Sequence, residues 1–252
     1  MKALITGASS GIGKELTKLL ANDYNDLVLV GRNIEKLEEF KSELLASNPN
    51  LIIKSVSLDV SKKENCIELY NDNKDVDLLV NNAGFGDYGF FDETNLDKDI
   101  SMIETNIIAL HTLTKLYLKD MVERNSGHIF NTASIAGFLP GPLMATYYAT
   151  KAYVVRLSEG IREELRRKKS KVKISILCPG PVKTNFENRA DVKFNFNGTD
   201  PKLIAKYAYK HLNKFYIVPQ FKIRCARFGS KLISSKAASK AVYNLQSKRT
   251  KK

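Results

Sequence analysis

Three residues in the middle of the chain have the types and spacing for acid–base chemistry on a carbonyl group. Ser134 follows an apolar run, and Tyr147 and Lys151 come later with i, i+4 spacing, which puts both side chains on one face of a helix. A free tyrosine has a pKa of about 10, and a nearby lysine ammonium lowers that pKa because it favours the phenolate. The serine hydroxyl can hold a carbonyl oxygen while the phenol donates or accepts its proton. A Tyr/Lys pair alone is usually a surface contact. The pair indicates a catalytic site only because Ser134 and a glycine-rich turn precede it in the right order.

A glycine-rich turn near the start of the chain is the second chemical feature. Residues 6–13 read Thr-Gly-Ala-Ser-Ser-Gly-Ile-Gly and lie between an apolar run and a segment of helical period. Glycines there let the backbone approach a pyrophosphate, which binds to N–H groups at a helix N-terminus. The spacing is Gly-x3-Gly-x-Gly rather than Gly-x-Gly-x-x-Gly, and tight turns also need glycine for steric reasons. The pattern favours a nucleotide site with the candidate residues Gly7, Ser9, Ser10, Gly11, Ile12 and Gly13.

The end of the second apolar run indicates which dinucleotide is bound. In NAD enzymes an acidic residue about twenty positions past the glycines binds the ribose 2′-hydroxyl. Here that place holds Gly31 and Arg32, and a guanidinium can bind a 2′-phosphate with paired hydrogen bonds. We expect NADP(H), with NAD(H) the less favoured choice; the alternative is a solvated arginine at a loop tip. Asp59 could accept from the adenine amino group, with Val60 beside it, or could simply cap the next helix.

The elements that must position these residues are read from the hydrophobic pattern. Short, continuously apolar runs alternate with segments of helical period, as in βαβ units whose parallel sheet is covered on both faces. The predicted strands are residues 3–6, 27–30, 51–55, 78–81, 128–132, 173–178 and a short closing strand at 215–219. The predicted helices are residues 13–21, 34–45, 62–70, 96–123, 145–167 and 201–212. This is an α/β chain with one doubly wound sheet in one domain.

Length and composition agree with one stable domain in a reducing compartment. The chain has 252 residues, a size that open α/β sheets reach undivided. Its three cysteines are odd in number and widely spaced, which disfavours disulfides or a zinc knuckle. The three histidines have no metal-ligand spacing and are expected to be partly exposed. The chain enters a strand at once and has no apolar run of about 18 residues, so we expect a cytoplasmic protein without a signal peptide.

The order of the motifs resembles the short-chain dehydrogenase/reductase family, in the subgroup with a Thr-Gly-x3-Gly-x-Gly turn. The matching motifs are residues 6–13, residues 81–84, Asn106, the set Ser134, Tyr147 and Lys151, and residues 179–182 with Thr184. The resemblance runs from residue 2 to about residue 219. It implies a Rossmann-type sheet and hydride transfer between NADP(H) and a ketone or secondary alcohol.

The resemblance also implies a role for each matching residue. Tyr147 would be the acid/base, Ser134 would steady the carbonyl oxygen, and Lys151 would lower the tyrosine pKa and hold the nicotinamide ribose. Asn106 would position a water in a proton relay through Lys151. The remaining cofactor-binding residues would be Asn82, Ala83 and Gly84 on the ribose and adenine side, and Pro179, Gly180, Val182 and Thr184 at the nicotinamide.

The substrate would lie over the nicotinamide, below the segment after the sixth strand. By resemblance its lining would include Phe138, Leu139, Leu143, Met144, Phe186, Val192, Phe194 and Phe196. Such a lining favours a hydrophobic ketone or 3-oxoacyl group, unless the phenylalanines pack on the scaffold. Cations in the same region could meet an anionic end of the substrate: Lys183, Arg189 and Lys193.

The rival interpretation of the whole chain is a regulatory protein that senses NADPH without turnover. Loss of Tyr147 or Lys151 would have favoured that interpretation, and both residues are present.

The basic charge of the protein is concentrated in its last residues. Residues 221–252 contain 10 of the 40 Lys and Arg residues and none of the 27 acidic ones, in a chain of net charge +13. Apolar residues recur there at helical spacing: Phe228, Leu232, Ile233, Ala237, Ala241, Val242 and Leu245. This pattern fits an amphipathic helix in weak contact with a membrane surface, or a helix docked on another subunit of a homodimer or homotetramer. Nucleic acid is not an expected partner, because no aromatic residues alternate with the basic ones.

All the motifs lie before residue 219, so we divide the chain into two parts after the last predicted strand. We expect residues 1–220 to form the NADP-binding catalytic domain. Residues 221–252 are expected to form a basic helical tail that is dispensable for hydride transfer.

Overall fold

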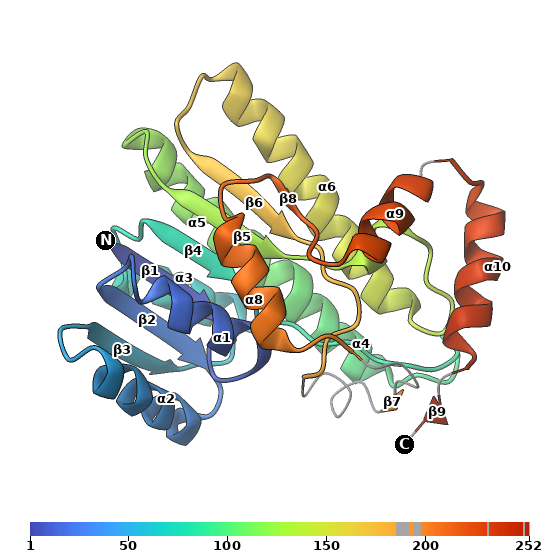
Figure 1. Cartoon of the computed structure of the whole chain (residues 1–252), viewed down its shortest axis with the longest axis horizontal. Coiled ribbons are helices and arrows are strands. Elements are labelled where there is room, and N and C mark those ends of the chain that lie inside the picture. Colours follow the sequence, from blue (N-terminus) through green and yellow to red (C-terminus); the bar gives the residue numbers. More distant parts are fainter. Residues whose placement is uncertain (185–191, 194–197, 231, 249, 252) are drawn as a thin grey trace.

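The protein is built on one parallel sheet of seven strands in the order β3-β2-β1-β4-β5-β6-β8 (Figure 1). The computed structural model describes residues 1–184, 192–193, 198–230, 232–248 and 250–251. The strands of the sheet are β1 (Lys2–Thr6), β2 (Asp26–Gly31), β3 (Ile52–Ser57), β4 (Leu78–Asn81), β5 (His128–Thr132), β6 (Lys173–Leu177) and β8 (Tyr216–Ile217). This is the Rossmann-type α/β fold that the sequence predicts.

Helices cover both faces of the sheet because successive strand residues point to opposite faces. In β1, Ala3 and Ile5 join one apolar cluster and Leu4 joins the other, and all three are fully buried. The first cluster is covered by α1 (Gly11–Leu20), α2 (Ile34–Ser47) and α8 (Pro201–Lys210). The second is covered by α3 (Lys63–Asp72), α5 (Leu110–Glu123) and α6 (Ala145–Arg167). The continuous apolar runs are therefore explained by burial on two sides.

The edge strand β3 departs from that pattern. Ile52 is 63% exposed, and every residue of the strand is exposed or half-buried. A strand at the edge of a sheet has a neighbour on one side only, and β2 is the one neighbour of β3. The expectation that every strand is buried on both faces is wrong here.

The helix predicted over residues 96–123 is interrupted. α4 (Leu96–Ile103) leads into a π-helical segment, Glu104–Ala109, before α5 begins. The wider turn of a π-helix shifts side chains relative to a regular helix, often at functional sites. It contains the buried Asn106, whose side chain contacts other elements described below.

His128 also departs from the sequence prediction. It opens β5 with 6% exposure, and its imidazole Nε2 lies 2.8 Å from Ser175 Oγ. Burial lowers the pKa of His128 from the usual 6.5 to about 4, with the Lys173 charge adding to the effect. The expectation of a partly exposed histidine is wrong for this residue.

Two helices follow the last strand of the sheet: α9 (Phe221–Gly229) and α10 (Ser235–Gln246). In Figure 1 they stand at one end of the molecule, apart from the helices that cover the sheet. Close to that end, β7 (Val192–Lys193) pairs with β9 (Thr250–Lys251) as a short antiparallel ribbon. Within the described part of the chain, no helix has the length and apolar character needed to cross a membrane.

Candidate active site

A pocket opens at the carboxyl ends of the central strands, where strand order reverses between β1 and β4. Ligands of open α/β sheets bind at this point. Eighteen of the predicted site residues line it: Gly7, Ser9, Ser10, Gly11, Ile12, Arg32, Asp59, Val60, Asn82, Ala83, Gly84, Ser134, Tyr147, Lys151, Pro179, Gly180, Val182 and Thr184. Gly13 and Asn106 lie behind this lining, and their contacts are described below.

The glycine turn between β1 and α1 has the shape that a phosphate site requires. Gly7 and Gly11 have φ of +68° and +56°, a region that L side chains rarely adopt. A Cβ on Gly13 would overlap the Gly7 carbonyl. A glycine at position 13 therefore lets the start of α1 pack directly on the turn at Gly7. Ser10, at the N-cap of α1, makes no side-chain cap hydrogen bond. The helix N-terminus can thus present its N–H groups to an anion.

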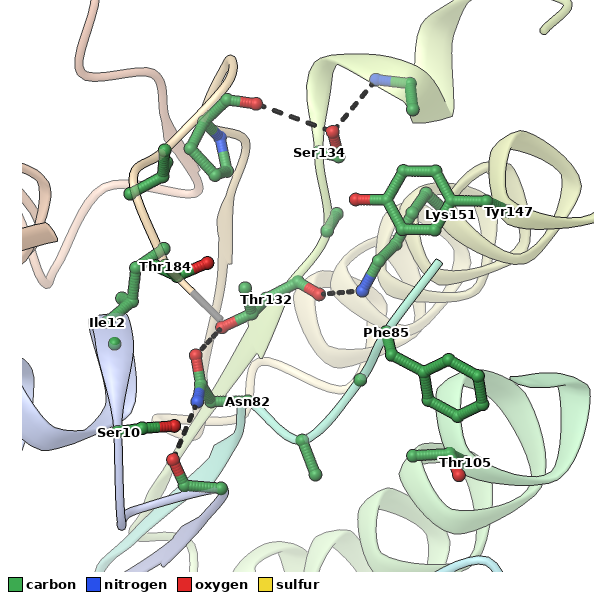
Figure 2. Close-up of a pocket in the computed structure, with 18 of the residues that line it drawn as sticks. Ser10, Ile12, Asn82, Phe85, Thr105, Thr132, Ser134, Tyr147, Lys151 and Thr184 are labelled. Atoms are coloured by element: carbon green, nitrogen blue, oxygen red, sulfur yellow. Dashed lines mark hydrogen bonds between the residues drawn. The ribbon is translucent and has the colours of Figure 1, made fainter. Parts of the chain in front are cut away.

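The end of β4 is held against this turn by Thr6. Its hydroxyl accepts from the backbone N–H of Asn82 at 3.0 Å and of Ala83 at 3.1 Å. The Asn82 side chain bridges to β5, accepting from Thr132 Oγ1 at 3.3 Å (Figure 2). These bonds fix the floor of the pocket between the glycine turn and the catalytic candidates.

At the far end of the pocket, Arg32 and Asp59 border the space beyond the glycine turn. Arg32 is exposed and lines the pocket, so its guanidinium can reach a bound phosphate. Asp59 accepts from the backbone N–H of Ser61 at 3.0 Å. It does not cap α3, whose N-cap is Lys62 without a side-chain bond.

The catalytic candidates occupy the other end (Figure 2). Ser134 is the N-cap of a short 3-10 helix (Ile135–Phe138) and lies two residues after the end of β5. Its Oγ accepts from Ala136 N–H at 3.1 Å and donates to the Pro179 carbonyl at 3.5 Å. Tyr147 and Lys151 are carried by α6, and Lys151 Nζ lies 5.9 Å from the centre of the Tyr147 ring. The three side chains therefore meet at one place, as their spacing predicts.

Lys151 is buried at 5% exposure, and its ammonium donates to the Thr132 carbonyl at 2.9 Å. Burial lowers the pKa of Lys151 from 10.5 to about 8, because a charge is less stable away from water. At neutral pH the group is still mostly cationic. It can therefore favour the phenolate form of Tyr147.

Asn106 lies directly behind Gly84. Its side chain donates to the Phe85 carbonyl at 2.9 Å and to Thr150 Oγ1 at 3.0 Å, and accepts from Phe85 N–H at 3.1 Å. A Cβ on Gly84 would lie 2.8 Å from Asn106 Oδ1 and 3.4 Å from Lys151 Nζ. Asn106 is thus near the lysine, and the π-helical segment is what brings it there.

The apolar lining expected for the substrate is only partly found. Met144 lines the pocket, whereas Phe138, Leu139, Leu143 and Lys183 do not. Phe138 packs against Tyr216 with ring centres 6.0 Å apart. Four other candidates, Phe186, Arg189, Phe194 and Phe196, lie outside the described residues, and of Val192 and Lys193 only the backbone is described.

Several pocket residues had no signal in the sequence. Thr132 contributes a backbone carbonyl, and Phe85, Thr105 and Tyr148 line the pocket without belonging to any motif. Gln246 of α10 also lines it, so the tail is part of the pocket wall. The expectation that residues after 220 are dispensable for hydride transfer does not fit this placement.

In the described ranges of the chain, the other cysteines and titratable groups do not form a competing centre. Burial raises the pKa of both Cys66 and Cys178 to about 12, which leaves these thiols protonated. Among the residues that the structure describes, no three His, Cys, Asp or Glu side chains are grouped so that they could hold a metal ion.

Comparison with known proteins adds independent findings. The family described as short chain dehydrogenase matches residues 1–193. An uncharacterized oxidoreductase of Staphylococcus epidermidis is 34% identical over 193 residues, which cover 75% of this chain and 81% of that protein. An uncharacterized oxidoreductase of Bacillus subtilis is 31% identical, covering 72% and 68%.

Two solved structures are similar over nearly the whole chain. A short-chain dehydrogenase from Sphingobium yanoikuyae in complex with NADPH has a TM-score of 0.82 and 25% identity, over 94% of this chain and 97% of that one. A short-chain dehydrogenase/reductase from Burkholderia phymatum in complex with NAD has a TM-score of 0.81 and 26% identity, over 90% and 91%.

Proposed function

The chain belongs to the short-chain dehydrogenase/reductase family, and on that premise we propose that it transfers a hydride between NADP(H) and the carbonyl or secondary alcohol of a hydrophobic substrate. As a family member it is an NAD(P)-dependent oxidoreductase of small molecules. The choice of NADP(H), the roles of the residues and the substrate class are the proposal.

The observation that carries the proposal is the meeting of Ser134, Tyr147 and Lys151 at one end of a pocket whose other end is a glycine turn. In the proposed mechanism, bound NADP(H) supplies or accepts the hydride. During reduction Tyr147 gives its proton to the carbonyl oxygen, so that hydride and proton together convert the ketone to an alcohol. During oxidation Tyr147 takes that proton back.

The neighbouring residues support this proton transfer. Ser134 Oγ donates a hydrogen bond to the reacting oxygen in place of its long bond to the Pro179 carbonyl. The Lys151 ammonium favours the phenolate and would also hold the nicotinamide ribose. Asn106, behind Gly84, would carry the proton onward through a water.

The choice of NADP(H) is supported by Arg32. It stands after β2 where an acid would bind the ribose of NAD, and it borders the pocket. The similar structures hold NADPH in one case and NAD in the other, so the preference of this chain depends on its own residues.

The proposal is tested by following NADPH oxidation with a panel of hydrophobic ketones and 3-oxoacyl thioesters. Consumption of NADPH with formation of the matching alcohol supports it. Tight NADPH binding without turnover of any member would instead favour a sensor. The presence of the complete set Ser134, Tyr147 and Lys151 makes turnover the expected result.

Two further expectations, a homodimer or homotetramer and a weak contact of the basic tail with membrane surfaces, stay predictions. Mass measurement in solution tests the first. Salt-sensitive binding to anionic vesicles tests the second, because salt screens exposed charges.

A further inference from the structure

The last turn of α10 brings a polar side chain to the catalytic end of the pocket. Gln246 is fully buried and belongs to the pocket lining together with Tyr147 and Tyr148. It belongs to the buried face of α10, after Ala238 and Val242. This is a glutamine on an otherwise apolar helix face.

Two tyrosines hold Gln246 in place. Its Nε2 donates to Tyr148 Oη at 2.7 Å, and its backbone carbonyl accepts from Tyr88 Oη at 3.0 Å. The rings of Tyr147 and Tyr148 lie 6.2 Å apart in an edge-on arrangement. Tyr148 thus contacts both the amide of Gln246 and the ring of Tyr147, the proposed acid/base.

The other end of the amide, Oε1, has no hydrogen-bond partner among the residues that the structure describes. Four buried side-chain atoms in the described part of the chain make no hydrogen bond, on Ser55, Asn81, Arg227 and Gln246. Of these residues only Gln246 lines the pocket. A buried acceptor without a donor is unfavourable, and an apolar residue would cover the same wall without that cost.

The surroundings of Gln246 offer apolar contacts and few competing polar groups. Tyr88, Leu143 and Met144 form a small buried cluster with the two catalytic-end tyrosines packed against it. Of this cluster, Met144 lines the pocket together with Tyr147 and Tyr148. A ligand group that enters here would meet the Met144 side chain, the two tyrosines and the Gln246 amide. Tyr148 holds the amide through Nε2, and the soft last torsion of a glutamine lets Oε1 adjust toward an incoming donor while that bond is kept.

We propose that Gln246 is a specificity-determining residue, whose Oε1 accepts a hydrogen bond from a hydroxyl group carried by an otherwise apolar ketone, away from the reacting carbonyl. The substrate class is therefore a hydrophobic hydroxyketone. The inference rests on the proposed function for the position of the reacting carbonyl at Tyr147.

The test compares pairs of hydrophobic ketones that differ only in one hydroxyl group. Their dissociation constants are measured by calorimetry on the NADP⁺-loaded protein, which cannot reduce a ketone, and kcat/KM is measured in parallel with NADPH. The variant Gln246→Met keeps the side-chain length and removes the amide. Gln246→Leu is a second, shorter apolar replacement. Asn244→Leu makes the same kind of change on the exposed face of α10 and serves as the control.

In the unaltered protein, at least one hydroxyketone should bind more tightly than its partner without the hydroxyl. Gln246→Met and Gln246→Leu should lower that preference about 10-fold, or about 1.4 kcal/mol. The ketone without the hydroxyl, the NADPH dissociation constant and the Asn244→Leu variant should change little.

Equal weakening of both members of a pair would overturn the inference, because it would mean that Gln246 only supports Tyr148. An unaltered protein without any hydroxyl preference would also overturn it. Binding with the predicted preference but no turnover with NADPH would leave the inference standing and contradict the proposed function.

Discussion

Lys151 combines a buried ammonium with a hydrogen bond to a backbone carbonyl of β5. With its pKa lowered to about 8 by burial, it loses its proton as the pH rises through that value. The pKa of Tyr147 then rises, and proton exchange with the substrate slows. We expect kcat/KM for ketone reduction to be flat below about pH 8 and to fall above it. A pH–rate profile measures this fall, and a profile that stays flat to pH 10 would contradict the prediction. The variant Lys151→Arg should move the fall in kcat/KM to higher pH because arginine stays charged.

Tyr147→Phe removes the proposed proton donor and leaves the ring. Loss of a general acid typically costs about 10²- to 10⁴-fold in rate, and we expect kcat to fall within that range. NADPH binding, followed by its fluorescence, should be nearly unchanged, since the phenol hydroxyl is the one group removed. Tyr148→Phe removes the neighbouring hydroxyl on the same helix and should keep most of kcat. A Tyr147→Phe variant with most of its activity would mean that another acid exists.

Arg32 provides the prediction on cofactor choice. A hydrogen bond to a charged group contributes about 1.5–3 kcal/mol, so NADPH should bind roughly 10- to 100-fold more tightly than NADH. Arg32→Asp should reverse the preference because the carboxylate repels the 2′-phosphate and can bind a ribose hydroxyl. Lys62→Asp makes the same charge change at an exposed residue outside the pocket lining and should not reverse it. Equal affinities of the unaltered protein for NADPH and NADH would contradict the prediction.

The elements of the fold position these residues through close contacts, and Gly84 is where three of them meet. The end of β4, the π-helical segment with Asn106 and α6 with Lys151 come together around its missing side chain. Gly84→Ala should push Asn106 away from Lys151 and lower kcat/KM about 10-fold or more, because small displacements at a catalytic site are costly. Gly160→Ala, in α6, has no atom within 4 Å of the added Cβ. It should keep full activity and gain about 0.5–1 kcal/mol of stability from the better helix propensity. Equal activities in both variants would show that the contact behind Gly84 is unimportant.

The paired strands β5 and β6 enclose His128, a group whose titration should destabilise the fold in acid. His128 has a pKa of about 4 in the folded state, against 6.5 when exposed. The unfolded chain therefore binds a proton that the folded protein does not, and stability is lost as the pH falls from 6.5 to 4. Between pH 7.5 and pH 5 we expect this residue to cost about 2 kcal/mol of unfolding free energy. Urea unfolding at both pH values measures it, and His128→Asn should reduce the difference by that amount. An unchanged difference in the variant would assign the acid sensitivity to other groups.

At the scale of the whole molecule, the chain returns after the last sheet strand to complete its own pocket. α9 contributes Ile223, which packs on Gly180 in the loop proposed to bind the nicotinamide, and α10 contributes Gln246. Truncation after Ser230 removes α10 but keeps the sheet and α9. We expect the truncated protein to fold and to bind NADPH within about 3-fold of the full chain, while kcat/KM falls about 10-fold or more because the pocket loses a wall. Full activity after truncation would restore the expectation that the tail is dispensable.

Much of this protein is determined by local sequence. The apolar runs predict the strands of the sheet to within about two residues, because a strand buried on both faces must be apolar along its length. The glycine turn follows from backbone sterics, and the meeting of Tyr147 and Lys151 follows from the period of one helix. Ser134 joins them because the carboxyl ends of parallel strands lie at one edge of a sheet. Site residues of these kinds lie in the pocket as predicted.

Tertiary structure alone decides the rest. Of the apolar stripe predicted for α10, Val242 is buried as expected, whereas Ala237, Ala241 and Leu245 are exposed. The helix buries Ala238 and Gln246 beside Val242 in their place. The π-helical segment and the burial of His128 are equally invisible in the pattern. Which face of a helix is buried depends on the surface that it meets, and that surface is built here by residues about a hundred positions or more away in the sequence. The period of the apolar residues shows which side chains share one face of a helix. Whether that face is buried depends on the free energy of docking, to which both contacting surfaces contribute.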